Sequence, residues 1–185
     1  MQSYFWILIA LGIVLLWIIF TYNGLIRRRN QVDESWSDID VQLKRRYDLI
    51  PNLIEAVKGY MTHERTTLEN ITKARTAAMS AKSMAEHAKA ENMLSETLKS
   101  LFAVSENYPD LKASQNFLQL QDELSDTENK IQAARRFYNA NTRDFNTAAQ
   151  TFPTNIIANL FKFAARDFFE LKEKAAREAP KVSFK

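Results

Sequence analysis

Apolar residues follow two patterns along this chain. Residues 4–22, YFWILIALGIVLLWIIFTY, form an unbroken stretch without a charged side chain. From residue 25 onward, apolar positions instead recur every three or four residues between polar ones, which is the period of an amphipathic helix. The 185 residues include only three Gly and four Pro. So few turn-forming residues argue against a fold of many short strands and predict few, long helices.

The apolar stretch predicts a transmembrane helix within residues 1–24. Its 19 residues extend about 28 Å as a helix, close to the ~30 Å of bilayer hydrocarbon. Aromatic residues of the kind found in interfacial belts stand near both ends: Tyr4, Trp6, Trp17, Phe20 and Tyr22. The alternative is a cleaved signal peptide, but no Lys or Arg precedes the stretch and no small-residue cleavage site follows it. We therefore expect a retained, single-pass anchor.

The orientation of this anchor is predicted from the charges beside it. Arg27, Arg28 and Arg29 directly follow the apolar stretch. Lys and Arg concentrate on the cytoplasmic side of membrane segments. We therefore expect the N-terminus outside, and the body of the protein in the cytoplasm at the cytoplasmic membrane.

A first amphipathic helix is predicted to continue from the membrane span. Its apolar stripe consists of Val32, Trp36, Ile39, Leu43, Tyr47 and Ile50. Pro51 either begins a second helix or kinks one continuous helix. The next stripe consists of Ile54, Val57, Met61, Leu68, Ile71 and Ala78. A turn near residue 80 and an unbroken helix both fit the composition there.

Two further helices follow. Asn107–Asp110, which contains Pro109, is expected to end a third helix over 84–106. A fourth helix, with Ser114 as its cap, has the most regular repeat in the chain and is expected to end at Pro153. Amphipathic helices joined by short connections predict an all-α, antiparallel up-down bundle of about four helices over 25–151.

The up-down order of four helices returns the chain to the membrane after residue 151. Residues 152–171 are rich in Phe and carry Lys162 and Arg166, a composition typical of an amphipathic segment at a membrane interface. The candidates for membrane contact are Phe152, Ile156, Leu160, Phe161, Phe163, Phe168 and Phe169. The alternative is that these side chains cap the open end of the bundle. Residues 172–185 are predicted to be a polar tail.

Few residues point to catalysis or to a bound cofactor. The chain has no Cys, which excludes disulfides and thiolate chemistry. His63-Glu64 begins a zinc-protease motif, but Thr67 stands where the second His is required. The glycines, at 12, 24 and 59, form no phosphate-binding loop. We expect no enzyme, metal or cofactor. The surplus of basic residues behind the net charge of +3 lies just after residue 26 and in 160–185. The middle of the chain is close to neutral and offers no broad basic surface, so we expect no nucleic-acid partner.

Polar residues also lie on or beside the apolar stripes. They are Arg45, Arg46, Asp48, Glu64, Arg75, Glu128, Arg135 and Tyr138. A charge at a helix-packing position is costly unless it is paired. These residues therefore predict either buried ion pairs that fix the helix register or a polar groove for a partner. The stripe positions favour one specific pair, Arg75 with Glu128.

Several short motifs follow one another over nearly the whole chain. They are Tyr22-Asn23, RRYDLIPNL at 45–53, His63-Glu64, YPDLKA at 108–113, Glu128-Asn129, RRFYN at 135–139 and Phe152-Pro153. In these motifs the chain resembles the LemA family. The resemblance implies a bacterial, single-pass membrane protein with a long helical bundle and no settled biochemical activity. The family usually has Phe-Gly-Phe where this chain has Phe161-Lys162-Phe163, so we expect a helix to replace the turn there.

These observations favour two functional classes over a third, an enzyme or transporter. The first is a non-catalytic membrane-anchored scaffold or adaptor, self-associating at the membrane, because anchoring raises the local concentration of weakly interacting copies. The second is a membrane-shaping protein that uses residues 152–169 as an interfacial wedge. The expected partners are the lipid bilayer, further copies of the chain and another membrane protein.

Overall fold

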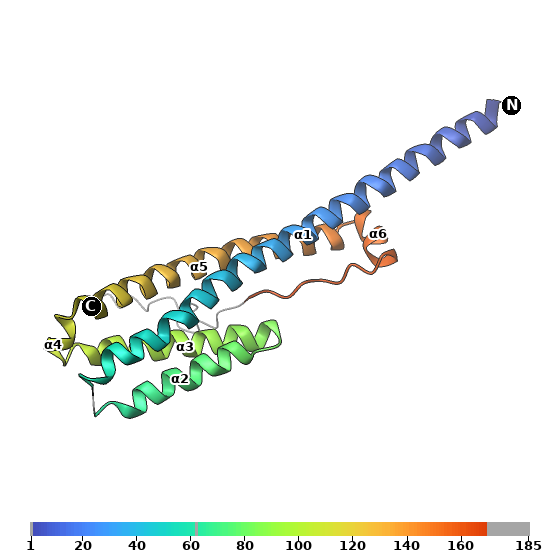
Figure 1. Ribbon diagram of the computed structural model, residues 1–185. Coiled ribbons are helices and arrows are strands. Elements are labelled where there is room, and N and C mark those ends of the chain that lie inside the picture. The colour runs from blue at the N-terminus through green and yellow to red at the C-terminus, as the bar shows by residue number, and fades with distance from the viewer. Residues whose placement is uncertain (1, 62, 170–185) are drawn as a thin grey trace, which may run out of the picture. The chain divides into compact units, whose positions relative to one another are not determined.

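The described part of the chain is all-helical. The computed structural model describes residues 2–61 and 63–169 (Figure 1). Its helices are α1 (Gln2–Lys58), α2 (Arg65–Ser80), α3 (Met84–Ser105), α4 (Pro109–Lys112), α5 (Gln115–Gln150) and α6 (Thr154–Leu160). The predicted all-α class is confirmed. The predicted number of about four helices is wrong, because six lie within the described ranges and include the short α4 and α6. The predicted tail 172–185 lies outside these ranges.

The described residues divide into two compact units. The first unit holds the chain up to Arg45 together with Asp126–Phe168. The second unit holds Arg46–Ser125 together with Phe169. Helices α1 and α5 each contribute residues to both units.

In the first unit, α1 and α5 run side by side and bury the apolar stripes predicted from the sequence (Figure 1). Val32 on α1 and Ile131 and Phe145 on α5 are 2% exposed or less. The rings of Trp36 and Tyr138 meet edge-on with their centroids 5.8 Å apart. The spacing of three and four residues therefore identifies the two faces that pack together.

In the second unit, α2 and α3 pack against each other. α2 ends at Ser80 and α3 begins at Met84, so the chain turns near residue 80. Ser83 and Glu86 form a capping box at the start of α3, which satisfies main-chain N–H groups that a helix terminus leaves unpaired. The N–H groups of Lys82 and Ser83 donate to the Glu86 carboxylate and hold its pKa below the usual value.

Three prolines within the described residues have different roles. Pro51 lies inside α1, which continues to Lys58, so the continuous-helix alternative is the correct one. The chain leaves the helix only at Gly59, and the second predicted stripe is therefore shared between α1 and α2. Pro109 begins α4, where its missing N–H costs nothing. Pro153 directly precedes α6 and follows the end of α5 at Gln150.

The chain beyond α6 differs from the sequence prediction. α6 ends at Leu160, Lys162 has a φ of 56°, and residues 163–169 form an extended stretch without helix or strand (Figure 1). The expectation of a helix through Phe161–Phe163 is therefore wrong, and among the described residues of the segment, 152–169, helix is confined to 154–160. The physical reason is that Lys162 adopts the left-handed conformation that a glycine adopts without a steric penalty. A turn is therefore present although Lys162 stands where the LemA family, which this sequence resembles, usually has Gly.

Replacing Lys162 by Gly is expected to stabilise the protein by about 1 kcal/mol, because a left-handed L-residue carries a steric cost that glycine lacks. The measurement is thermal unfolding of the full chain in detergent, followed by circular dichroism. Lys162→Ala is the matched control, since it also removes the charge but keeps a Cβ. Equal midpoints for the two variants would show that Lys162 is not strained.

Candidate functional site

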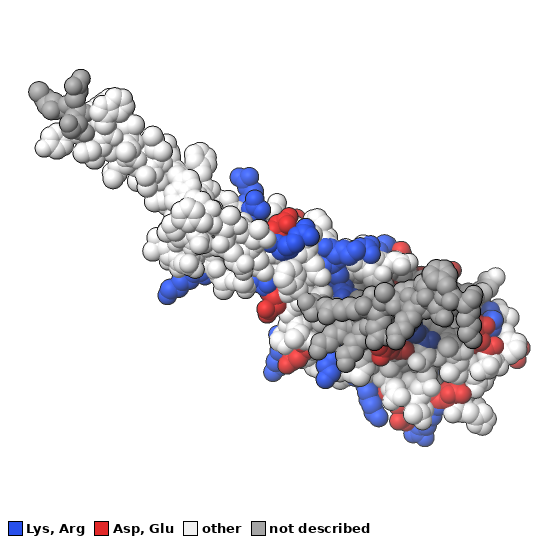
Figure 2. Space-filling view, turned by 180° about the vertical axis from the view of Figure 1, so that it is seen from behind, with Lys and Arg blue, Asp and Glu red and all other residues white. Residues whose placement is uncertain are grey.

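One helix in the described residues is long and apolar enough, by length and composition, to cross a membrane. It is α1, whose most apolar window of 18 residues has a mean hydropathy of 2.5 and is 0% buried. Figure 2 shows this end of the molecule as a rod without Lys, Arg, Asp or Glu on the visible face. Unburied apolar surface of this extent is typical of a helix that meets lipid.

α6 packs on the C-terminal part of this apolar stretch. Ile157 and Ala158 of α6 form a buried cluster with Leu25 of α1, each 2% exposed or less. The surrounding partly buried residues are Trp17, Ile18, Tyr22, Ala148, Ala149 and Phe163. The end of α5 and the packed face of α6 therefore lie beside the last turns of the apolar stretch, within the first unit.

The seven candidates for membrane contact divide by exposure. Phe152, Ile156, Leu160, Phe161 and Phe168 are 75%, 54%, 68%, 48% and 42% exposed, respectively. Phe163 is half-buried and Phe169 is fully buried. α6 thus buries one apolar face against α1 and presents a second apolar face, made of Ile156 and Leu160, outward. A helix of seven residues with two apolar faces is unusual at a water-exposed surface.

Basic side chains accompany α6 and the α1 residues that follow the apolar stretch. The Arg29 guanidinium lies over the ring of Phe163, 5.7 Å from its centroid, a cation–π contact. Arg28 donates to the main-chain oxygen of Asp144 over 3.5 Å. Arg27 and Lys162 are exposed. An apolar face accompanied by cations is the combination that an interface with anionic headgroups favours.

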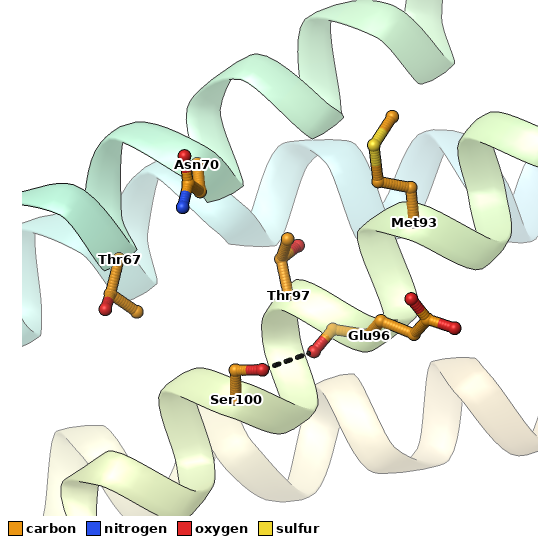
Figure 3. A pocket seen from close by; sticks show the side chains of 6 residues that line it. All are labelled: Thr67, Asn70, Met93, Glu96, Thr97 and Ser100. Atoms are coloured by element: carbon orange, nitrogen blue, oxygen red, sulfur yellow. Dashed lines mark hydrogen bonds between the residues drawn. The ribbon is translucent and has the colours of Figure 1, made fainter.

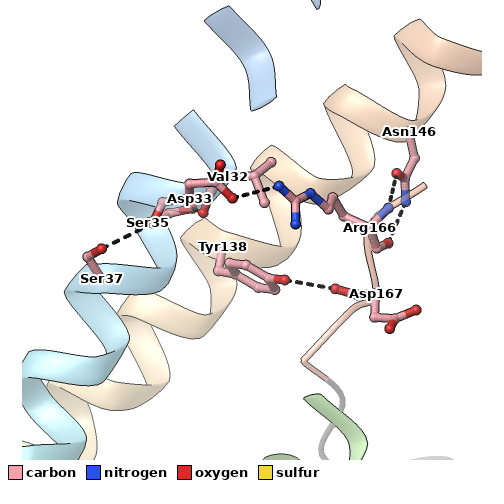
Figure 4. Close-up of polar contacts among 8 residues, drawn as sticks. All are labelled: Val32, Asp33, Ser35, Ser37, Tyr138, Asn146, Arg166 and Asp167. Carbon is pink, nitrogen blue, oxygen red and sulfur yellow. Dashed lines mark hydrogen bonds and ion pairs between the residues drawn. The ribbon is translucent and has the colours of Figure 1, made fainter. Parts of the chain in front are cut away.

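The extended segment after α6 is held along α1 and α5 by polar contacts (Figure 4). Asn146 accepts from the N–H of Arg166 over 2.8 Å and donates to its carbonyl over 2.9 Å. Tyr138 donates to the Asp167 carbonyl over 2.9 Å, and Arg166 pairs with Asp33 over 2.9 Å. Burial raises the pKa of Tyr138, which keeps this donor protonated. Asn146 is not among the residues that the sequence singles out.

A buried polar cluster occupies the second unit. Arg46 forms an ion pair with Glu91, at 1% and 3% exposure, and donates to the Ser95 hydroxyl over 3.0 Å. The Tyr47 hydroxyl donates to the same Glu91 carboxylate. The sequence predicts Arg46 as a member of such a cluster but does not indicate Glu91. Glu91 lies three residues before Leu94, in phase with the α3 stripe, and this spacing is the signal that could have identified it.

Arg75 compensates for the proline inside α1. In a regular helix the N–H of residue 51 donates to the carbonyl of residue 47, but Pro51 has no N–H. The Arg75 Nε donates instead to the Tyr47 carbonyl, over 2.8 Å. A side chain from α2 thus satisfies the group that Pro51 leaves unpaired, and α1 continues.

The other predicted polar residues are dispersed. Arg45 pairs with Asp126 at the surface, over 3.7 Å, and Asp48 is exposed. Glu64 accepts from the Tyr108 hydroxyl over 3.4 Å, and burial, followed by the Glu64 charge, raises the pKa of Tyr108. Glu128 accepts from Gln132 over 3.3 Å, and Arg135 is buried on α5. The pairing of Arg75 with Glu128 stays a prediction.

One shallow pocket lies between α2 and α3 (Figure 3). It has a volume of about 240 Å³ and is lined by Thr67, Asn70, Met93, Glu96, Thr97 and Ser100. Ligand pockets usually measure about 300–1,000 Å³. Within the described residues no group of three or more His, Asp or Glu side chains is arranged to hold a metal ion.

Breaking the buried ion pair is expected to be costly. Arg46→Met or Glu91→Leu alone leaves one charge buried without its partner and is expected to cost roughly 3–5 kcal/mol in unfolding free energy. The double variant removes both charges and is expected to recover most of this loss. The neighbouring Arg45→Met is the control, expected to cost less than about 1 kcal/mol because its pair is exposed. Purely additive losses in thermal unfolding would contradict the coupling.

The role of Arg75 is tested in two backgrounds. In the natural chain, Arg75→Met leaves the Tyr47 carbonyl unpaired and is expected to cost about 1–3 kcal/mol. In a Pro51→Ala background the restored N–H bonds to that carbonyl, so the same substitution is expected to cost clearly less. Equal losses in both backgrounds, measured by thermal unfolding, would show that Arg75 does not compensate for Pro51.

Comparison with known proteins finds similarity to one family over most of the chain. The sequence model described as the LemA family matches residues 35–184. A protein of Metamycoplasma hominis named Protein LemA is 30% identical to this chain over 161 residues, which is 85% of this chain and 74% of that protein.

Proposed function

The chain belongs to the LemA family, and we propose that it is a non-catalytic, membrane-anchored helical scaffold or adaptor that self-associates at the cytoplasmic membrane. In this proposal the apolar part of α1 spans the bilayer. α6 makes a second contact, at the interface, on the side from which the helical body emerges.

The packing of α6 on α1 is the observation that carries the membrane contacts of this proposal. Trp17, Ile18 and Tyr22, which pack against the cluster of Leu25 with α6, are among the last residues of the apolar stretch. If this stretch spans the bilayer, α6 lies at the boundary between headgroups and hydrocarbon, where its outward residues Ile156 and Leu160 meet the ends of acyl chains near the headgroups. Burying one such side chain is worth about 1.5–3 kcal/mol.

The charges support one orientation of the anchor. The cations Arg27, Arg28 and Arg29 are one to two helical turns beyond Tyr22. Positive charge at this place favours the cytoplasmic face, which carries anionic lipids. We therefore place the N-terminus outside and the helical body in the cytoplasm.

A non-catalytic role is supported by the chemistry of the second unit. Its ionisable cluster, Arg46 with Glu91, is buried and internally paired, and the pocket between α2 and α3 is small and shallow. Paired, buried charges of this kind fix helix register and are shielded from a substrate. The partners are then the bilayer, further copies of the chain and another membrane protein, with no nucleic acid and no cofactor.

The depth of α6 is the first test. Because the chain has no Cys, single spin labels are placed at Ile156→Cys and, as control, at Lys130→Cys on the exposed face of α5. In vesicles, the label at 156 is expected to be relaxed more strongly by oxygen than by a water-soluble nickel reagent, and the label at 130 the reverse. Water-like accessibility at both positions would overturn the interfacial contact.

Self-association is tested separately, by the number of full-length chains in each lipid nanodisc. More than one chain per disc is expected when protein is limiting, with a defined copy number. Single chains at all protein-to-lipid ratios would overturn self-association and leave an adaptor that binds a different membrane protein.

Membrane shaping is the second candidate, favoured by the apolar surface at and beside α6. Phe152, which precedes α6, and Leu160 at its end are 75% and 68% exposed, and they give this segment the means to wedge into one leaflet. Tubulation of vesicles by the natural chain but not by a Phe152→Ser/Leu160→Ser variant, seen by electron microscopy, would support it. Round vesicles with both proteins would contradict it.

A further inference from the structure

The extended segment 163–168, which we call the strap, is bound as a peptide ligand is bound. Asn146 contacts both main-chain groups of Arg166, and Tyr138 contacts the Asp167 carbonyl. A paired amide-to-main-chain contact recognises an extended backbone and not a particular side chain. The face of α1 and α5 that holds the strap is therefore a binding surface that the chain covers with its own residues (Figure 4).

The strap joins α6 through a strained residue. Lys162, with a φ of 56°, carries the cost of a left-handed L-residue, while Phe161 and Phe163 on either side keep negative φ. Short hinges under strain favour exchange of the segment that they connect, because opening relieves the strain.

We propose that the strap exchanges between two copies of this chain, so that each strap lies on the α1–α5 face of the other copy. This inference rests on the proposed self-association and names its contact surface. Every bond that holds the strap, and the burial of Phe169 directly after it, is remade in the partner, so the contact energies cancel. Two free energies then decide whether exchange occurs. One is the strain released at Lys162, and the other is the cost of bringing two copies together.

The membrane anchor lowers the cost of bringing two copies together. Two copies held in one bilayer meet at a high effective concentration. A two-fold axis along the membrane normal keeps both α1 anchors parallel while the straps cross in both directions, which makes the contact symmetric and closed. Exchange is thus compatible with the proposed orientation of α1.

The exchange is tested by cross-linking two differently tagged full-length chains. One chain carries Asp33→Cys and the other Arg166→Cys, which are residues in direct contact with side chains 55% and 41% exposed, respectively. Loss of an exposed ion pair destabilises the fold little, and the bonds to Asn146 and Tyr138 remain. The two chains are reconstituted together in vesicles of phosphatidylethanolamine and phosphatidylglycerol and treated with a short bis-maleimide.

A cross-link between the two tags is expected, because it forms only when the strap of one chain lies on α1 of the other. Chance collisions are measured with Arg65→Cys in place of Asp33→Cys, a residue whose side chain is 88% exposed and bonds to Glu69. A chain carrying both Asp33→Cys and Arg166→Cys reports the unexchanged form as an internal cross-link. Internal cross-links alone, or no cross-links above the Arg65 control, would overturn the exchange.

Lys162 provides a second measurement. Lys162→Gly removes the strain of the unexchanged form, so the ratio of intertag to internal cross-links is expected to fall about five-fold or more relative to Lys162→Ala. Equal ratios for these two variants would overturn the role of the hinge. Nanodiscs with several chains but no intertag cross-link would reject exchange and retain self-association, whereas single chains in every disc would reject both.

Discussion

The continuity of α1 is the constraint on which the rest of the structure depends. One helix runs from Gln2 to Lys58, fully apolar around its circumference near the start and apolar along a single stripe afterwards. The series of main-chain hydrogen bonds along α1 is incomplete at Pro51, which has no N–H to donate. Arg75 supplies a donor to the orphaned Tyr47 carbonyl, so a side chain from α2 maintains the helix that also carries the apolar stretch.

A second consequence of the long α1 is that other parts of the chain pack against its apolar stretch. α6 covers part of it through Ile157 and Ala158, and the strap continues along α5 through main-chain bonds and along α1 through the ion pair of Arg166 with Asp33. The first unit is therefore closed by a segment with little regular structure of its own. Main-chain bonds to Asn146 and Tyr138, together with the ion pair of Arg166 with Asp33, hold it in place.

Much of the fold can be predicted from the sequence because the residues that pack together recur with the period of the helix. The stripes on α1 and α5 follow from spacings of three and four, and residues such as Val32 and Phe145 are buried as expected. Arg46 stands out because a charge beside a stripe requires a partner. That partner, Glu91, does not stand out among the many charges of α3, although its spacing to Leu94 matches the stripe.

What the sequence by itself determined is local: an all-α chain, an apolar stretch long enough for a bilayer, and the packing faces of the long helices, because each depends on residues within a few turns of one another. The tertiary structure decided what depends on residues far apart. Pro51 stays inside a helix because Arg75, 24 positions away, bonds to Tyr47. Lys162 stays in a left-handed turn because Asn146 and Tyr138 hold the backbone that follows it. In both cases a distant hydrogen bond outweighs the local preference of the residue.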